Sequence, residues 1–177
     1  MSSSSELVLI TGGARAGKSR FALQLAHRME ARRRLFVATA VPCDTEMRRR
    51  IARHRRERDG CWETLEEPVH LPGRLPKERL SRGNLLLFDC LPTFITNLLL
   101  AKRSEAQILS QVRALLRVFR RPGLHALLVT NEVGLGVVPA HPLGREFRDL
   151  LGRVNQEAAR AAGAVYLMVS GIPVRLK

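Results

Sequence analysis

Five short apolar runs recur along the chain, and the segments between them space their apolar residues differently. Within each run, apolar side chains occupy successive positions, as in strands buried on both faces; the runs cover residues 7–10, 35–40, 84–90, 124–130 and 164–169. Most intervening segments repeat apolar residues every three or four positions, which predicts helices after residue 19, ending near 32–34, and over 45–58, 93–101, 105–120 and 143–161. This alternation indicates an α/β fold with a mostly parallel central sheet and helices on both faces.

Two segments have a weaker pattern. A short edge strand is predicted over residues 62–65, whereas Pro68, Pro72 and Pro76 favour irregular chain beyond it. The tail over residues 170–177 has room for one further strand. Because no repeat or low-complexity linker divides the chain, we expect a single domain over residues 1–177.

The first apolar run leads directly into a phosphate-binding loop. Residues 12–19 match the pattern Gly-x-x-x-x-Gly-Lys-Ser between a predicted strand and a predicted helix. Gly12 and Gly17 allow backbone conformations that a side chain would forbid, so N–H groups can surround phosphate oxygens at the start of the helix. Lys18 can reach the β- and γ-phosphates, and the Ser19 hydroxyl can bind Mg²⁺. The loop therefore predicts a nucleoside triphosphate bound by Gly12, Gly13, Ala14, Arg15, Ala16, Gly17, Lys18 and Ser19.

Composition narrows the class of protein. The 177 residues are 45% hydrophobic and 26% charged, which is typical of a globular domain. The three cysteines fit neither a disulfide framework nor a zinc site, in keeping with a reducing cytoplasm. Residues 1–5 lack the pattern of a signal peptide, and Asp89, Pro92 and Asn97 interrupt the apolar region 85–100. We therefore expect a cytoplasmic protein without a membrane span.

The formal net charge of +14 favours polyanionic partners, which include nucleotides, nucleic acids and anionic lipids. Aromatic residues, on which bases could stack, make up only 5% of the chain, and no recognisable nucleic-acid-binding motif is present. No specific nucleic acid is therefore expected as a partner. A nucleotide-dependent nucleic-acid binder is kept as the alternative from another class of protein.

Asp89 comes at the end of a predicted strand. An acid there commonly completes the Mg²⁺ shell of a P-loop enzyme, directly or through water. The alternative is a capping residue for the helix predicted near Thr93. Because a phosphate-binding loop needs such a partner, we favour the first interpretation, with Ser19 and Asp89 as the candidate Mg²⁺ ligands.

His54 lies on the same predicted helix face as Met47 and Ile51, so its side chain should point inward. Seven arginines surround it in sequence: Arg48, Arg49, Arg50, Arg53, Arg55, Arg56 and Arg58. Their positive field should favour a neutral, nucleophilic imidazole, and their guanidinium groups could neutralise a leaving pyrophosphate. A half-buried histidine beside a solvated basic face fits the position equally well.

Two further carboxylates follow predicted strands. Glu132 could accept from a base edge, a hydroxyl or a metal-bound water, or it could cap a loop, and its position does not distinguish these roles. Glu66 could accept the N1–H and N2–H₂ groups of guanine, although a single carboxylate is a weak signal.

Several segments together resemble a known family. They are residues 11–19, 38–40, 44–55, 62–68, 89–91, 96–99, 130–134, 152–156 and 170–177. Over nearly its whole length, the chain resembles the bifunctional adenosylcobinamide kinase/adenosylcobinamide-phosphate guanylyltransferases of cobalamin biosynthesis. The phosphate-binding loop alone is generic, whereas Arg50-Ile51-x-x-His54 combined with Thr130-Asn131-Glu132-Val133-Gly134 is specific.

The resemblance implies a RecA-like fold, a homotrimer with active sites near the subunit contacts, and two reactions at one site. ATP or GTP phosphorylates the corrinoid adenosylcobinamide, and GTP then transfers GMP through a histidine, which matches His54, to give adenosylcobinamide-GDP. Lys18 would serve both steps. The family's remaining nucleotide contacts match Ala38, Thr39, Ala40, Arg55, Arg56, Glu57, Arg58, Glu66 and Asp89. The alternative within enzymes is a P-loop small-molecule kinase without guanylyl transfer.

Overall fold

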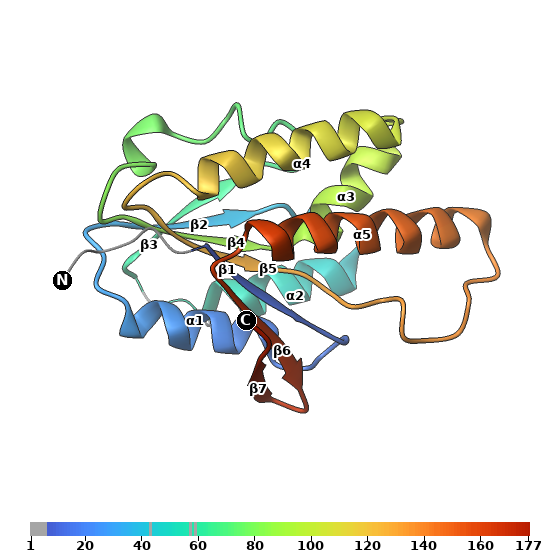
Figure 1. The fold of residues 1–177 in the computed structure, drawn as a ribbon, viewed down its shortest axis with the longest axis horizontal. Helices are drawn as coiled ribbons and strands as arrows, with labels where there is room; N and C mark the ends of the chain where they lie inside the picture. The colour runs from blue at the N-terminus through green and yellow to red at the C-terminus, as the bar shows by residue number, and fades with distance from the viewer. Residues whose placement is uncertain (1–6, 43, 57, 59) are drawn as a thin grey trace.

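Seven strands form one sheet in the computed structural model, which describes residues 7–42, 44–56, 58 and 60–177 (Figure 1). Their order across the sheet is β3-β2-β4-β5-β1-β6-β7. The strands are β1 (Leu7–Gly12), β2 (Arg34–Ala38), β3 (Trp62–Glu66), β4 (Leu85–Asp89), β5 (His125–Val129), β6 (Ala164–Val169) and β7 (Ile172–Arg175). Only β7 pairs antiparallel, so the mostly parallel sheet, the edge strand β3 and the additional strand in the tail are confirmed.

Helices cover both faces of the sheet. They are α1 (Lys18–Arg28), α2 (Thr45–Arg56), α3 (Leu91–Leu100), α4 (Glu105–Phe119), α5 (Pro142–Ala161) and the 3₁₀ turn η1 (Lys77–Arg79). Figure 1 shows α3, α4 and α5 on one side of the sheet, with α1 and α2 on the other. No helix in the described part of the chain is both long and apolar enough to cross a membrane.

The sheet alternates its side chains between two apolar layers. Leu85 and Leu87 of β4 pack with α1, whereas Leu86 and Phe88 pack with α3, α4 and α5. Phe88 is fully buried, and its ring lies 5.9 Å from that of Phe94 in an edge-on arrangement. Burial on both faces explains why these strands read as continuous apolar runs rather than as alternating ones.

Local side-chain bonds set several helix boundaries. The Asp44 carboxylate accepts from the Met47 backbone N–H at 2.6 Å, which confirms the predicted start of α2. Ser104 and Gln107 form a reciprocal capping box at the start of α4. Helix α1 ends at Arg28 rather than near 32–34, because the backbone is already extended at Met29 and the Arg32 N–H donates to the Gly83 carbonyl.

Glu67 stabilises the turn that follows β3. Its Oε1 atom accepts from the backbone N–H groups of Val69 at 3.1 Å and His70 at 2.9 Å. Burial by itself raises the pKa of this carboxyl, but the two N–H donors, with His70 and Arg74 nearby, lower it by more. The pKa of Glu67 therefore lies below its usual value, because the folded state favours the carboxylate.

We expect Glu67→Gln to destabilise the protein by roughly 1 kcal/mol at neutral pH, because the amide oxygen is a weaker acceptor than a carboxylate. A lowered folded-state pKa gives stability that is present above the unfolded-state pKa and lost as the pH falls through the folded-state pKa. Urea unfolding at several pH values should show the two proteins converging in acid. The exposed neighbour Glu66→Gln serves as the control, and a difference that persists in acid would contradict this account.

Candidate active site

The phosphate-binding loop lies at the carboxyl end of β1 and has the backbone geometry that its glycines predict. Gly12 has φ of 144°, and a Cβ there would lie only 2.5 Å from the Met168 carbonyl oxygen. Gly17 has φ of 92° and directly precedes α1. Side chains are excluded at both positions, so the loop can turn tightly around the N-terminus of α1, where backbone N–H groups attract phosphate.

Lys18 is directed back across this loop. Its side chain is buried, and Nζ donates to the Gly13 carbonyl at 2.5 Å. The loop is also held from outside, because the Gly171 N–H, in the turn between β6 and β7, donates to the Ala16 carbonyl at 3.1 Å. The lysine ammonium is therefore held within the loop, where an incoming phosphate group can replace the carbonyl as its partner.

A cavity of about 640 Å³ opens beside the loop, and its lining combines chemically distinct groups. Carboxyl ends of parallel strands meet at this edge, which is where ligands bind in open α/β sheets. The cavity is lined by residues 14–20, together with Glu46, Arg49, His54, Asp89, Cys90, Val129 and Asn131. Lys18, Ser19, His54 and Asp89 thus line the same cavity.

A second cavity of about 550 Å³ lies between α2 and the end of β2. Much of its wall is apolar and includes Phe36, Met47 and Ile51. His54 and Asp89 line this cavity as well as the first, so they stand where the two spaces meet. The helix face predicted for Met47, Ile51 and His54 therefore faces a cavity rather than the sealed core.

Charged side chains line the far side of the second cavity. Arg55 forms an ion pair with Glu66, and both side chains are more than half exposed. Arg58 lies 3.9 Å from the centre of the Phe36 ring and donates to the His54 carbonyl at 3.0 Å and to Thr64 Oγ1 at 3.1 Å. The pKa of Arg58 is lowered, chiefly by burial and then by the positive charge of Arg55. The negative charges of Asp89 and Glu66 oppose this shift. The cavity thus pairs an apolar floor with charged groups that could bind a polar ring and phosphates.

The chain is similar to proteins of one known family over nearly its whole length. Residues 8–176 match the model of the family described as cobinamide kinase / cobinamide phosphate guanyltransferase. The chain belongs to this family. It is 38% identical to the bifunctional adenosylcobalamin biosynthesis protein CobU of Escherichia coli (strain K12), with 97% of this chain and 99% of that protein covered. It is 42% identical to the protein CobP of the same description from Pseudomonas aeruginosa, with 96% of each covered.

Solved structures extend the similarity to a wider fold. An ATPase of the type III secretion system of pathogenic bacteria superimposes with a TM-score of 0.60 at 9% identity, over 93% of this chain and 51% of that one. A second solved ATPase domain gives a TM-score of 0.56 at 13% identity, over 94% and 70% of the two chains. At such low identity only the fold is shared, and it is the expected RecA-like P-loop fold.

The residues singled out from the sequence divide between the two cavities. Ala14, Arg15, Ala16, Gly17, Lys18 and Ser19 line the first; Ala38, Ala40, Arg55, Arg56, Arg58 and Glu66 line the second. Thr39 lines neither, because its buried hydroxyl donates to the Cys90 carbonyl at 3.2 Å. Gly12 and Gly13 belong to the phosphate-binding loop but line neither cavity. Glu57 lies outside the described residues. Arg49, one of the seven arginines noted around His54, also lines the first cavity, whereas Glu46 and Asn131 were missed as cavity residues, because helical or loop position alone does not reveal which side chains border a cavity.

Mg²⁺ is implied by the P-loop, and the residues present fit it. Among the described residues, no three His, Cys, Asp or Glu side chains form a group that could hold a metal by themselves. Mg²⁺ usually takes only one or two carboxylates and obtains its other oxygens from phosphates and water. The oxygen donors Ser19 and Asp89, which line the same cavity, suit that mode of binding.

Glu132 belongs to a partly buried hydrogen-bond network behind the loop. Its Oε1 atom accepts from the Thr11 hydroxyl and from the Asn155 amide, each at 3.1 Å. Asn155 also donates to the Asn131 carbonyl at 2.9 Å and accepts from the Thr130 hydroxyl at 2.7 Å. The network ties β1, the segment after β5 and α5 together, so the Glu132 carboxylate accepts hydrogen bonds from groups of the chain itself, which is a structural role. The sequence feature that could have predicted this network is Asn155, a polar residue on the apolar face of a predicted helix.

We expect Asn155→Ala to cost about 1–3 kcal/mol of stability, because it leaves the buried Thr130 hydroxyl and the Asn131 carbonyl without this partner. Urea unfolding monitored by circular dichroism measures the change. Gln156→Ala is the matched control, since that side chain is exposed on the next position of the same helix. Equal effects of the two substitutions would contradict a stabilising role for the network.

Proposed function

We propose that the protein catalyses both reactions of its family, the phosphorylation of adenosylcobinamide and the transfer of GMP from GTP to the resulting phosphate. The observation that supports this best is the position of His54 between two cavities. The first cavity brings the P-loop lysine and the Asp89 carboxylate to this histidine, and the second offers an apolar space beside it. A P-loop and a nucleophile in one space suit successive displacements at phosphorus.

In the kinase step, the terminal hydroxyl oxygen of adenosylcobinamide attacks the γ-phosphorus of ATP or GTP. The bond from this phosphorus to the bridging oxygen breaks, the nucleoside diphosphate leaves, and the hydroxyl proton passes to solvent. Lys18 and the N–H groups of the loop stabilise the charge that develops on the phosphate oxygens. Mg²⁺, held by Ser19 and Asp89, would neutralise part of the phosphate charge.

Guanylyl transfer proceeds in two displacements. A ring nitrogen of His54 attacks the α-phosphorus of GTP, and pyrophosphate leaves as the bond to its bridging oxygen breaks. A phosphate oxygen of the phosphorylated corrinoid then attacks the same phosphorus, which restores His54 and yields adenosylcobinamide-GDP. Dividing the transfer in this way replaces one demanding encounter of two polyanions by two displacements at a fixed site.

The second cavity is the proposed site for the guanine ring. Phe36 and Ile51 provide an apolar surface, and the Glu66 carboxylate could accept the N1–H and N2–H₂ groups of guanine. Glu66 would have to exchange its ion pair with Arg55 for these hydrogen bonds. Because that pair is exposed, the exchange costs little.

We also propose that the protein is cytoplasmic and assembles as a homotrimer, as the resemblance implies. Leu135 and Val137, in the segment between β5 and α5, are 89% and 94% exposed, and Ile172 on β7 is 66% exposed. Such apolar side chains are commonly covered by a neighbouring subunit.

The proposal is tested with GTP labelled at the α-phosphate. We expect wild-type protein to acquire a label that acid removes and base does not, and His54→Ala to acquire none. The control is His141→Ala, which replaces an exposed histidine at the start of α5. The absence of label on wild-type protein that folds and binds GTP would leave a P-loop kinase without guanylyl transfer as the better interpretation.

We expect Lys18→Ala to lower both activities by about a hundredfold or more, because both steps rely on the same phosphate-binding loop. Product formation from adenosylcobinamide with ATP, and from its phosphate with GTP, measures the two steps separately. Lys77→Ala removes an exposed lysine from the η1 turn and should change neither. Retention of one activity in Lys18→Ala would show that the steps use separate sites.

A further inference from the structure

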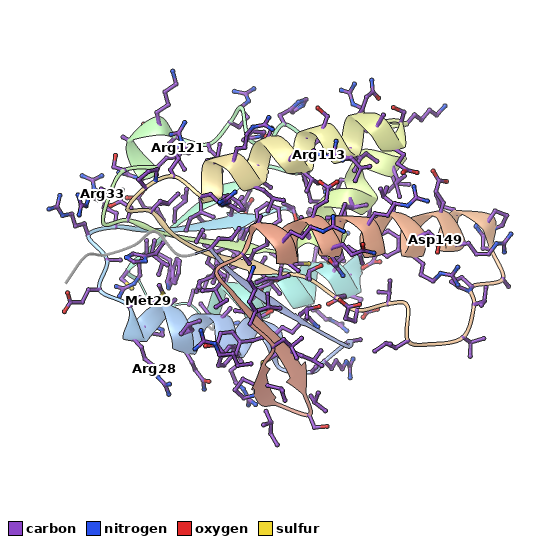
Figure 2. All side chains as sticks on the ribbon, viewed as in Figure 1. Arg28, Met29, Arg33, Arg113, Arg121 and Asp149 are labelled. Atoms are coloured by element: carbon purple, nitrogen blue, oxygen red, sulfur yellow. The ribbon has the colours of Figure 1, made fainter. Side chains whose placement is uncertain are left out.

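Six exposed arginines gather at the edge of the sheet opposite the two cavities. They precede β2, β4 and β5, whose amino ends share one edge because these strands are parallel. Figure 2 shows three of them, Arg28, Arg33 and Arg121, along one end of the molecule. The full set, which we term the arginine edge, is Arg28, Arg32, Arg33, Arg82, Arg120 and Arg121.

Backbone hydrogen bonds hold the three segments of this edge side by side. The Arg32 N–H donates to the Gly83 carbonyl, and the Gly83 N–H donates to the Gly123 carbonyl, each at 2.8 Å. Neighbouring strands in a sheet lie about 4.8 Å apart. The three segments therefore offer their arginines in a row across the end of the sheet.

Two of the arginines lie across glycines of the neighbouring segments. Arg32 crosses Gly83, where an added Cβ would meet the arginine side chain at 3.4 Å. Arg82 crosses Gly123 so closely that a Cβ there would overlap its side chain. These glycines let the side chains extend along the edge rather than away from it.

Within the described residues, the arginine edge has no carboxylate partner. In the described residues, none of the ion pairs involves any of the six arginines. Segments 28–34, 81–84 and 120–124 contain a single carboxylate, that of Glu30. Arg28 and Arg120 offset the negative ends of α1 and α4, but Arg32, Arg33 and Arg82 lie at no helix end. The guanidinium groups of the arginine edge can therefore bind several anionic groups of a partner.

We propose that the arginine edge docks the protein on an anionic membrane surface through lipid phosphates. Guanidinium groups bind phosphate with two parallel hydrogen bonds, and a basic cluster is attracted to the negative surface of such membranes. The row ends in loops with no projecting helix or strand that could enter a duplex groove, and its three segments contain no aromatic residue for base stacking. Docking by this edge leaves the cavities at the opposite edge open to substrates.

The experiment is sedimentation of the full-length protein with phosphatidylcholine vesicles, with and without phosphatidylglycerol. We expect wild-type protein to bind only the vesicles with phosphatidylglycerol, and to dissociate at about 0.5 M NaCl. Arg33→Glu/Arg82→Glu should weaken binding by about tenfold or more. Lys102→Glu/Arg103→Glu, which makes the same change in net charge in the turn between α3 and α4, should bind as wild type does.

Three results would overturn the proposal. One is the absence of binding by wild-type protein to the anionic vesicles. Another is an equal loss in the two double variants, which would indicate a general effect of net charge. The third is tighter binding to duplex DNA that depends on Arg33 and Arg82, which would assign the edge to nucleic acid. GTP binding by each variant shows that the variant has folded. Vesicle binding and the labelling of His54 are measured separately, so one can fail while the other succeeds.

Discussion

The candidate active site depends on a close approach between two backbones at the end of β1. Gly12 lies against the Met168 carbonyl of β6, with no room for a side chain between them. On the other side of β1, the Glu132 N–H donates to the Gly12 carbonyl at 3.1 Å. The start of the phosphate-binding loop is therefore fixed by the neighbouring strand on one side and by the segment after β5 on the other. The position of Lys18, and so of any bound phosphate, follows from this constraint.

The apolar face of helix α2 does not pack into the core as those of the other helices do. Its apolar residues Met47 and Ile51 are only half-buried and line the second cavity, whereas the apolar faces of α1, α3, α4 and α5 contribute buried residues to the core. Its Arg55 side chain reaches β3 through the ion pair with Glu66, and Arg58, just beyond the helix, adds a hydrogen bond to Thr64. An amphipathic helix is normally held by its apolar face. Here that face lines the second cavity, which makes the helix part of the candidate site rather than of the core.

The two ends of the parallel strands carry different kinds of polar side chains. The carboxyl edge collects the phosphate-binding loop, Asp89 and the Glu132 network, and its polar groups largely bind one another. At the amino edge, arginines from successive connections stand beside each other without carboxylate partners in the described structure. A net charge of +14 thus has a spatial distribution that composition cannot express.

Much of the architecture could be predicted from local patterns. Successive apolar positions identified the parallel strands, since burial on both faces leaves no polar alternation, and the sheet in turn implied that Asp89 and the phosphate-binding loop share an edge. Helix ends were less accurate where a tertiary contact decided them, as at Arg28, because a backbone bond to Gly83 is invisible in the sequence. The side-by-side arginines were missed for the same reason, since they are separated by about fifty and forty residues along the chain and meet only through strand order.

The sequence by itself determined the phosphate-binding loop, the type of fold and the family, because these depend on short motifs and on the period of apolar residues. Only the tertiary structure decided that His54 borders two cavities, that Thr39 faces the interior, and that Asn155 binds Glu132 behind the loop. Each of these contacts joins residues that are distant in the chain. Their geometry is set by strand order and by the packing of helices on the sheet, which no local pattern encodes.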